Sequence, residues 1–361
     1  MPSHDGGVRV TRDVGVVGYG TIGKRVADAV RSQPDMALVG VAKRSPDYAA
    51  AVAHDAGIPL YAAGEEDRFS GSGVPTAGTV ADLVERVDAV VDATPSGVGA
   101  DNRDIYVDAG TPAVFQGGED DSIAETSFTA RANYRDAVGT DRVRVLSCNA
   151  TGLARLLAPL DEAYGVETAR ATLVRRGGDP GQTDRGPIND IVPDPFGESH
   201  HAADVETVLP GMDVRTRGVK VPTDLMHLQS VRVELVDPPA SVRLLRRTLS
   251  AESRLLLLDS ASGIEGCGDL LDVARDLERP RTDFWENCVF AESVSLEGGE
   301  CTLFQAIDQE SDVVPENVDA VRAVTRTAAG RESRALTDRS LGIGSLPTTG
   351  TGRRATVESD D

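Results

Sequence analysis

Short apolar runs alternate with amphipathic segments along the first 147 residues. Runs at residues 14–17 and 37–42 predict strands, and the segment 21–31 between them predicts a helix from the spacing of its apolar positions. This alternation is typical of βαβ units, in which helices join parallel strands. Further strands are predicted at residues 58–62, 89–93, 113–116 and 143–146, and further helices at 80–86 and 103–109. We therefore expect an α/β domain with a parallel sheet over residues 1–147.

The pattern changes after residue 147. Four leucines at helical spacing predict an amphipathic helix at 153–164. Strands separated by long loops are then predicted at residues 169–174, 231–236, 289–296 and 302–307, with helices at 242–249 and 270–277. We expect an α+β domain with a mainly antiparallel sheet over residues 148–311.

The end of the chain divides into two further parts. Pro315 lies in the first turn of a predicted helix at 315–327, a position that proline tolerates. We assign residues 312–342 to a C-terminal helical segment. Residues 343–361 are rich in Gly, Thr and charge without periodicity, which predicts a disordered tail.

The charge of the chain is strongly negative. Its 361 residues carry 58 acidic and 37 basic side chains, and only Lys24, Lys43 and Lys220 are lysine. Nucleic acids and anionic membranes are bound by basic surfaces, so this balance argues against such partners. No stretch has the length or composition of a membrane span or a secretory signal, and we expect a cytoplasmic protein. Because salt screens self-repulsion, the acidic surface further favours a salt-rich cytoplasm.

The cysteines and histidines show no metal-binding pattern. Cys148, Cys267, Cys288 and Cys301 are widely spaced, and no C-x-x-C pair is present. The pair His200-His201 lacks a third ligand at convincing spacing, so no metal is expected. A disulfide framework is not indicated either.

A glycine motif directly follows the first predicted strand. Gly18, Gly20 and Gly23 form G-x-G-x-x-G with Thr21 and Ile22, at the start of the first predicted helix. The first glycine allows a tight turn, the second lets the backbone approach a pyrophosphate, and the third lets the helix pack on the strand. In this context the motif predicts a Rossmann-type dinucleotide-binding domain. A glycine-rich turn in another α/β fold is the structural alternative.

The end of the second predicted strand bears on the choice of dinucleotide. NAD-binding sites usually have an acid there, but this chain has Lys43 and Arg44, and no acid before Asp47. A cationic pair suits the 2′-phosphate of NADP. We expect NADP, with NAD as an alternative cofactor; a solvated basic turn is the other interpretation.

Cys148 lies where a predicted strand gives way to a helix. A thiol at a helix N-terminus has its thiolate stabilised, so its pKa falls and its nucleophilicity rises. Position alone leaves Cys148 open as either a nucleophile or a packed core thiol.

The segment S-C-N-A-T-G-L at residues 147–153 resembles the nucleophile motif of the archaeal, or type II, glyceraldehyde-3-phosphate dehydrogenases. The resemblance extends, in order and at similar spacing, over residues 13–342. It includes G-Y-G-T-I-G-K-R-V-A at 18–27, R-R-G-G-D-P at 175–180, G-P-I-N at 186–189, S-H-H at 199–201, V-P-T-D-L-M-H at 221–227 and Q-E-S-D-V-V-P-E-N at 309–317. Ala150 and Asp224 depart from the family pattern, which usually has Thr at both positions.

The resemblance implies roles for three residues. Cys148 attacks the aldehyde of glyceraldehyde 3-phosphate, and His227 is the general base that takes the hydroxyl proton as hydride leaves. Asn149 and the backbone N–H of Cys148 are candidates for the oxyanion contact. Inorganic phosphate then releases 1,3-bisphosphoglycerate. On spacing alone, a core position is the more common interpretation of His227, and the resemblance favours the base.

The resemblance also implies binding residues, a homotetramer and a return of the C-terminal helix at residues 312–342 to the first domain. Substrate and phosphate ligands are expected among Ser147, Asn149, Thr151, Arg175, His200 and His201, and the cofactor site is expected to include Gly118, Arg176 and Gln309. Arg175 and Arg176 are also compatible with a surface ion pair. Aspartate-semialdehyde and N-acetylglutamyl-phosphate dehydrogenases are alternatives of the same architecture, and a non-catalytic NADP-binding redox sensor is an alternative of another class.

Overall fold

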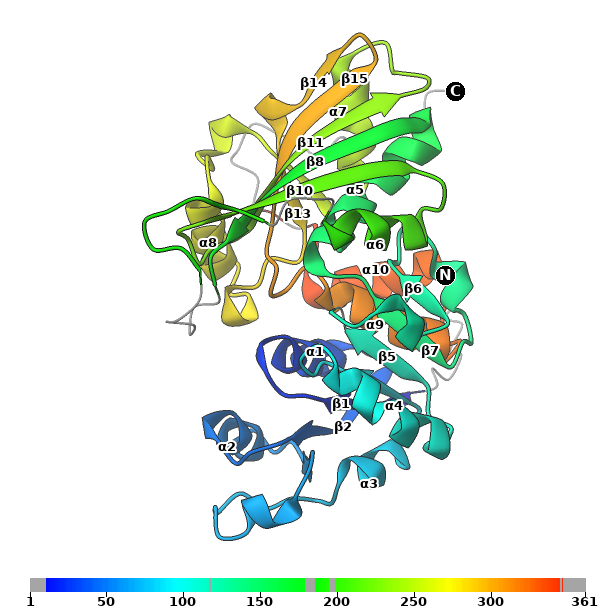
Figure 1. The fold of residues 1–361 in the computed structure, drawn as a ribbon, viewed down its shortest axis with the longest axis vertical. Coiled ribbons are helices and arrows are strands. Elements are labelled where there is room, and N and C mark those ends of the chain that lie inside the picture. The colour runs from blue at the N-terminus through cyan, green and yellow to red at the C-terminus, as the bar shows by residue number, and fades with distance from the viewer. Residues whose placement is uncertain (1–10, 117, 179–185, 195–198, 345, 347–361) are drawn as a thin grey trace, which may run out of the picture.

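A computed structural model describes residues 11–116, 118–178, 186–194, 199–344 and 346. The chain forms two lobes, each built around its own β-sheet (Figure 1). Most of the tail expected at residues 343–361 lies outside the described residues. Ile343 is buried, however, and the backbone N–H of Gly344 donates to Glu286 at 2.8 Å, so ordered structure extends past residue 342.

The first lobe contains a seven-stranded sheet in the order β3-β2-β1-β4-β5-β7-β6, and all its strand pairs are parallel. The strands are β1 (Arg12–Val17), β2 (Met36–Lys43), β3 (Leu60–Ala62), β4 (Ala89–Asp92), β5 (Ala113–Gln116), β6 (Thr126–Phe128) and β7 (Arg142–Val145). The helices are α1 (Thr21–Ser32), α2 (Tyr48–Asp55), α3 (Val80–Val84) and α4 (Val98–Ala109). Central strands such as β4 are fully buried, which explains their continuous apolar sequences. The parallel α/β domain predicted from the sequence is confirmed.

The second lobe contains an eight-stranded mixed sheet, in which β8 pairs with β10 and β12 with β13 in parallel while the other pairs are antiparallel. Its strands are β8 (Val166–Arg176), β9 (Val192–Pro193), β10 (Asp213–Val221), β11 (His227–Leu235), β12 (Leu255–Leu258), β13 (Asn287–Phe290), β14 (Ser295–Glu297) and β15 (Glu300–Ile307). Its helices are α5 (Cys148–Tyr164), α6 (His200–Val208), α7 (Val242–Ser250) and α8 (Cys267–Asp276). The antiparallel majority agrees with the expected α+β architecture.

Two helices end the described chain, α9 (Val314–Val324) and α10 (Gly330–Leu341). Every residue of α9 is buried, and α9 contacts α1, β4, β5 and β7 of the first lobe. In Figure 1 these two helices, in orange and red, lie where the lobes meet. A segment late in the sequence therefore completes the core of the first lobe and connects it to the second.

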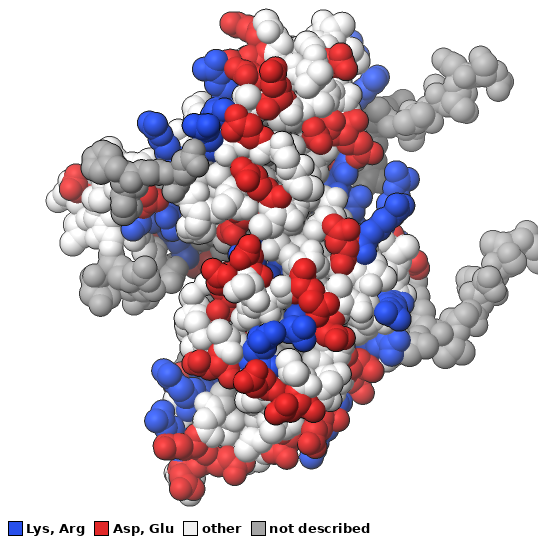
Figure 2. Space-filling model, turned by 45° about the vertical axis from the view of Figure 1, so that its right-hand side comes forward, with Lys and Arg blue, Asp and Glu red and all other residues white. Residues whose placement is uncertain are grey.

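The surface carries the charge expected from the composition. In Figure 2 acidic side chains spread over the visible face, with basic side chains dispersed among them. Within the described residues, no helix has the length and apolar character needed to cross a membrane.

Candidate active site

The glycine turn has the geometry that a dinucleotide requires. Gly18 has φ +90°, and a Cβ there would lie 2.8 Å from the backbone of Ala93. A Cβ at Gly23 would lie 1.7 Å from the carbonyl oxygen of Gly18, so β1 and α1 could not pack this closely with a larger residue. A Cβ at Gly20 would meet none of the described atoms within 4 Å. The turn is thus closed toward the protein and open beside Gly20, at the N-terminus of α1, where a pyrophosphate would bind.

A small group of basic residues lies at the carboxyl end of β2. The Lys43 Nζ is 2.8 Å from Asp47 Oδ2, while Arg44 is exposed. Asp47 also caps α2, because its side chain accepts from the N–H groups of Ala49 and Ala50. Burial, followed by the proximity of Arg281 and Lys43, lowers the pKa of Lys24 on α1. Two of the three lysines of the chain are therefore neighbours beside the glycine turn, and Asp47 neutralises part of their charge.

Cys148 is the first residue of α5 and remains partly exposed. Burial of the surrounding site raises the pKa of its thiol to about 12, and the Asp312 carboxyl adds to the increase, while Arg175 and Arg176 oppose it. The expectation of a lowered thiol pKa is therefore wrong for the resting site, because lost hydration outweighs the helix N-terminus and the arginines. The thiol is protonated at neutral pH and needs a base to react.

Asn149 connects the cysteine to both buried histidines. Its Nδ2 lies 3.9 Å from Cys148 Sγ, 3.1 Å from His227 Nδ1 and 3.3 Å from His201 Nε2. Asn149 is only 1% exposed and His227 only 5%, so these groups meet in a largely dehydrated pocket. The structure thus brings together the nucleophile, the oxyanion candidate and the base that the sequence predicted.

A chain of buried amides fixes the orientation of Asn149. The Gly152 carbonyl accepts from Asn287 Nδ2 at 2.7 Å and from Gln305 Nε2 at 3.2 Å. Gln305 Nε2 also donates to Gln229 Oε1 at 2.7 Å, and Gln229 Nε2 donates to Asn149 Oδ1 at 3.1 Å. Because a carbonyl can only accept, Gly152 sets the direction of every bond in this chain. The NH2 group of Asn149 must therefore face the histidines.

This direction also determines where the two imidazole rings carry their protons. An amide NH2 only donates, so His227 Nδ1 and His201 Nε2 act as acceptors. The proton of His227 is then on Nε2, and that of His201 is on Nδ1, 3.0 Å from Ser199 Oγ. Burial, with Arg175 contributing, lowers the pKa of each ring to about 3. Both histidines are neutral at neutral pH, and the Nδ1 lone pair of His227 borders the same amide nitrogen as Cys148 Sγ.

The predicted arginines end β8 beside this group. Arg175 Nη1 lies 2.9 Å from Asp194 Oδ2, and Arg176 Nη1 lies 2.8 Å from Glu310 Oε1. Both guanidinium groups act on the pKa of Cys148 and His227, so they are close to the reacting atoms. The sequence left open whether these arginines bind a ligand or form ion pairs. In the structure they form ion pairs and also border the site.

Some of the other predicted site residues line an open hollow, and Thr151 is buried. A hollow of about 560 Å³ is lined by Ser147, Gly118 and His200 among others, and the His200 ring stacks on His201 with centroids 4.0 Å apart. Thr151 is fully buried and does not line the hollow; its hydroxyl donates to the Leu146 carbonyl and so stabilises the start of α5. Among the described residues, no group of three or more metal-ligating side chains is present.

Several residues of the site were missed from the sequence. Gln229 and Gln305 lie on β11 and β15 with their side chains fully buried, and Gln229 follows His227 by two positions on the same face of β11. A polar residue repeated on the inward face of a strand was the available signal. Arg25 of α1, which contacts Asp283 at 2.6 Å and Glu310 at 2.7 Å, had no local signal because both partners are distant in sequence.

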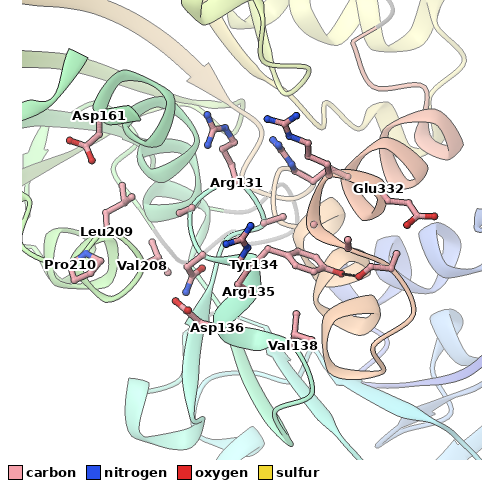
Figure 3. A pocket seen from close by; sticks show the side chains of 18 of the residues that line it. Arg131, Tyr134, Arg135, Asp136, Val138, Asp161, Val208, Leu209, Pro210 and Glu332 are labelled. Atoms are coloured by element: carbon pink, nitrogen blue, oxygen red, sulfur yellow. Dashed lines mark hydrogen bonds between the residues drawn. The ribbon is translucent and has the colours of Figure 1, made fainter. Parts of the chain in front are cut away.

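A larger hollow of about 1240 Å³ lies elsewhere, and Cys148, Asn149 and His227 do not line it. Figure 3 shows Leu209 and Pro210 at the left of the view and Glu332 at the right, and Arg131 and Arg135 lie between them. None of these residues is a site residue predicted from the sequence.

A dinucleotide-binding sheet joined to a second domain with a cysteine beside a neutral histidine is typical of dehydrogenases that react through a thiol. This is the class that the fold and the site define. Residues 147–274 match the family described as "Glyceraldehyde 3-phosphate dehydrogenase, C-terminal domain", and residues 12–130 match "Dihydrodipicolinate reductase, N-terminus".

Similar proteins specify the family further. The chain is 58% identical to a glyceraldehyde-3-phosphate dehydrogenase of Haloarcula marismortui, over 92% of this chain and 94% of the relative. It is 57% identical to the protein of that name from Halobacterium salinarum, over 91% and 99%, and 46% identical to glyceraldehyde-3-phosphate dehydrogenase 2 of Methanosarcina acetivorans, over 91% and 98%. The chain belongs to the glyceraldehyde-3-phosphate dehydrogenase family. Family and fold together imply a nicotinamide cofactor and small-molecule substrates.

Proposed function

We propose that the protein is a phosphorylating glyceraldehyde-3-phosphate dehydrogenase that uses NADP in preference to NAD. The observation that carries this proposal is the contact group of Cys148, Asn149 and His227 at the start of α5, in a chain of this family. The group supplies a nucleophile, a donor for an oxyanion and a neutral base, which are the three functions that aldehyde oxidation through a thioester requires.

The first step is attack by sulfur. Cys148 Sγ bonds to C1 of glyceraldehyde 3-phosphate, and the thiol proton passes through His227 to the aldehyde oxygen, giving a thiohemiacetal. The Asn149 NH2 and the backbone N–H of Cys148 donate to that oxygen as charge develops on it. When the Asn149 N–H exchanges its contact with His227 for the oxygen, while Gln229 still donates to Asn149 Oδ1, the Nδ1 lone pair of His227 becomes free to accept a proton. The raised pKa of the Cys148 thiol makes this base necessary.

The remaining steps release the product. His227 removes the hydroxyl proton as hydride leaves C1, and a thioester remains on Cys148. When bound, the cofactor supplies the acceptor for this hydride. An oxygen of inorganic phosphate then attacks the thioester carbonyl, the C–S bond breaks, and His227 returns its proton to the sulfur as 1,3-bisphosphoglycerate departs. Because His227 is neutral at rest, it can first accept the hydroxyl proton and later return a proton to the sulfur.

The phosphate group of the substrate and inorganic phosphate both need positively charged partners in this acidic protein. Arg175 and Arg176 are the guanidinium candidates, and His200, His201 and Ser147 are further polar candidates. Asp194 and Glu310 hold the two arginines, so a phosphate would compete with a carboxylate for each guanidinium. We propose that Arg175 binds a phosphate group and that Arg176, as part of the cofactor site with Gly118 and Gln309, faces the nicotinamide side.

The residues around the glycine turn fit the cofactor. The open space at Gly20, with Thr21 and Ile22 at the start of α1, suits a pyrophosphate. Lys43 and Arg44 would bind the 2′-phosphate of NADP, and the proximity of Lys24 to Lys43 supports a site for a phosphate dianion. Because Asp47 already pairs with Lys43, the preference should be moderate, and NAD remains a substrate.

We also propose the organisation that accompanies this activity. Residues 1–147 form the dinucleotide-binding domain and 148–311 the catalytic domain, while residues 312–342 return to the first domain. The contacts of α9 with α1 and β7 support this division. A homotetramer in the cytoplasm is proposed by likeness to the family.

One assay tests the proposal. Reduction of NADP and of NAD by glyceraldehyde 3-phosphate is followed in molar KCl, with and without inorganic phosphate, for the wild type and Cys148→Ser. Sustained turnover is expected only for the wild type with phosphate, and more efficiently with NADP. Turnover that does not need phosphate, or that survives in Cys148→Ser, would contradict the proposal.

A further inference from the structure

Glu310 is held by two arginines that come from different lobes. Its Oε1 accepts from Arg176 Nη1 at 2.8 Å, and its Oε2 lies 2.7 Å from Arg25 Nη2. All three side chains are largely buried, with 8% of Arg176, 15% of Glu310 and 8% of Arg25 exposed. One carboxylate charge is therefore divided between two guanidinium charges, in a place where little water screens them.

Arg25 has little freedom to leave this position. Its Nε donates to Asp283 Oδ1 at 2.6 Å, and its Nη1 donates to the Thr21 carbonyl at 2.8 Å. Each nitrogen of the guanidinium group thus has its own acceptor, and the rigid fork of an arginine fixes the direction of all three contacts. The start of α1, beside the glycine turn, is in this way connected to the carboxylate that holds Arg176.

The charge of Arg176 reaches the reacting thiol. Burial raises the pKa of the Cys148 thiol, and the Asp312 carboxyl adds to the increase. Arg175 and Arg176 oppose it, so both guanidinium groups favour the thiolate. A carboxylate that binds an arginine more tightly cancels more of its charge. The strength of the contact between Glu310 and Arg176 therefore bears on the charge beside Cys148.

The neighbouring arginine has a similar arrangement. Asp194 Oδ2 lies 2.9 Å from Arg175 Nη1, and Asp194 Oδ1 lies 3.7 Å from Lys220 Nζ. Each arginine of the site is thus bound by a carboxylate that also faces a second cation. The second cation at Glu310 is the more buried one, because 8% of the Arg25 side chain is exposed against 39% of Lys220. Since water screens Arg25 less, we expect the larger effect there.

We propose that Arg25 is a positioning residue for Arg176: by sharing Glu310, it keeps part of the Arg176 charge available to the Cys148 thiolate and to anionic substrates. The inference deepens the proposed function, because it rests on Cys148 being the reacting thiol. Without Arg25, Glu310 would turn its charge to Arg176 and neutralise it more fully. Arg25 thus acts on the site through Glu310, without touching the substrate.

The ratio of two alkylation rates measures the charge beside Cys148 without turnover. Iodoacetate is an anion and iodoacetamide is neutral, and both react with the same thiolate, so the ratio of their rate constants rises with the local positive charge. The rates at Cys148 are measured on the full chain by peptide mass spectrometry, at one pH and one KCl concentration. Arg25→Met should lower the ratio of iodoacetate to iodoacetamide about two- to fivefold, and Glu310→Gln should raise it by a similar factor. Arg25→Lys keeps the positive charge, and its ratio should lie between those of the wild type and Arg25→Met.

Two controls separate this effect from a general change in the protein. Arg281 also joins the second lobe to α1, because its Nη2 lies 3.0 Å from Asp28 Oδ2, but this pair does not include Glu310. Arg281→Met removes the same charge and should leave the ratio at Cys148 unchanged. Cys267, a partly exposed thiol at the start of α8, provides a reference ratio within each variant.

A double variant shows whether Arg25 acts through Glu310. If it does, Arg25→Met should have almost no effect on the ratio in a Glu310→Gln background. A direct effect of the Arg25 charge would instead be the same in both backgrounds. If Arg25→Met does not fold, Arg25→Gln provides the same comparison.

Three results would overturn the proposal for Arg25. These are a ratio that does not fall in Arg25→Met, an equal fall in Arg281→Met, or equal effects of Arg25→Met in the two backgrounds. A wild type that keeps its activity after complete alkylation of Cys148 would instead refute the proposed function and this inference with it, so the activity of the alkylated wild type distinguishes the two failures.

Discussion

Glu316 forms the centre of a buried ion network that supports the helix carrying Cys148. Its Oε1 accepts from Arg155 Nη2 at 2.6 Å and from Arg254 Nη1 at 2.8 Å, and its Oε2 accepts from the N–H of Ala130 at 2.6 Å. Glu316 is fully buried, and Arg155 and Arg254 are nearly so. One carboxylate of α9 thereby joins α5, the segment before β12 and the loop after β6. Glu316→Gln removes its charge with little change in volume.

The pKa of Glu316 and the usual cost of breaking a buried ion pair both give the size of the effect. Burial alone would raise the pKa of Glu316, but Arg155 and Arg254 outweigh it and lower the pKa from 4.5 to about 2. At about 1.4 kcal/mol per pKa unit, this difference corresponds to about 3.5 kcal/mol of stability. Removing one partner of a buried ion pair costs about 3–5 kcal/mol in other proteins. We therefore expect Glu316→Gln to lower the free energy of unfolding by about 3–5 kcal/mol at pH 7.

The same pKa gives the pH dependence. Because the folded-state pKa is depressed, the stabilisation is complete above about pH 4.5 and is lost as the pH falls toward 2. The gap in stability between wild type and Glu316→Gln should narrow over that range.

Urea unfolding at fixed protein and KCl concentration measures this quantity. The double variant Arg155→Met/Glu316→Leu should be less destabilised than the two single changes added together, because it leaves no uncompensated charge on that pair. Asp272→Asn, which breaks an exposed pair with Arg275, is the control and should cost less than about 0.5 kcal/mol. A loss below about 1 kcal/mol for Glu316→Gln would refute the reasoning.

Three further predictions concern the site. Gln229→Leu removes the bond that orients Asn149, so kcat should fall about 10- to 100-fold with little change in KM, measured by steady-state kinetics; an unchanged kcat would exclude the amide chain from catalysis. Lys43→Ala should raise the KM for NADP about tenfold and leave that for NAD within about twofold, and equal changes for both would remove Lys43 from the 2′-phosphate site. Because burial lowers the pKa of His227 to about 3, the pH profile of kcat/KM for the wild type should show no acid limb from His227 between pH 6 and 8, and a group of pKa near 6.5 that disappears in His227→Gln would disprove this.

Local signals predicted the first lobe well and parts of the second poorly. The turn at Gly18 and the start of α1 depend on neighbouring residues, so the sequence specifies them directly. By contrast, β10 reads Asp-Val-Arg-Thr-Arg and alternates exposed with buried positions, and it was missed because its charged residues hide the apolar ones. The helix α10 was missed because its buried face includes Ser333 and Thr337, which bond to Asp319 of α9 and are not apolar.

In the site too, features set by neighbouring residues were predicted, and features set by long-range contacts were not. Cys148, Asn149 and His227 were found from motifs, but their protonation was not, because it depends on burial and on distant charges. The partners of Arg175 and Arg176 are Asp194 and Glu310, which come from other parts of the chain and approach only in the folded protein. A single sequence contains little information on such long-range pairs, and this explains why the lowered thiol pKa was expected.

Detection of a covalent intermediate on Cys148 is the decisive test of the thioester mechanism. The enzyme is mixed with glyceraldehyde 3-phosphate and NADP in molar KCl without inorganic phosphate, denatured in acid, and analysed by intact and peptide mass spectrometry. We expect one 3-phosphoglyceroyl group on Cys148, which disappears when inorganic phosphate is added and is absent in Cys148→Ser. No adduct in the wild type despite reduction of NADP, or an adduct on another residue, would contradict a thioester mechanism at Cys148.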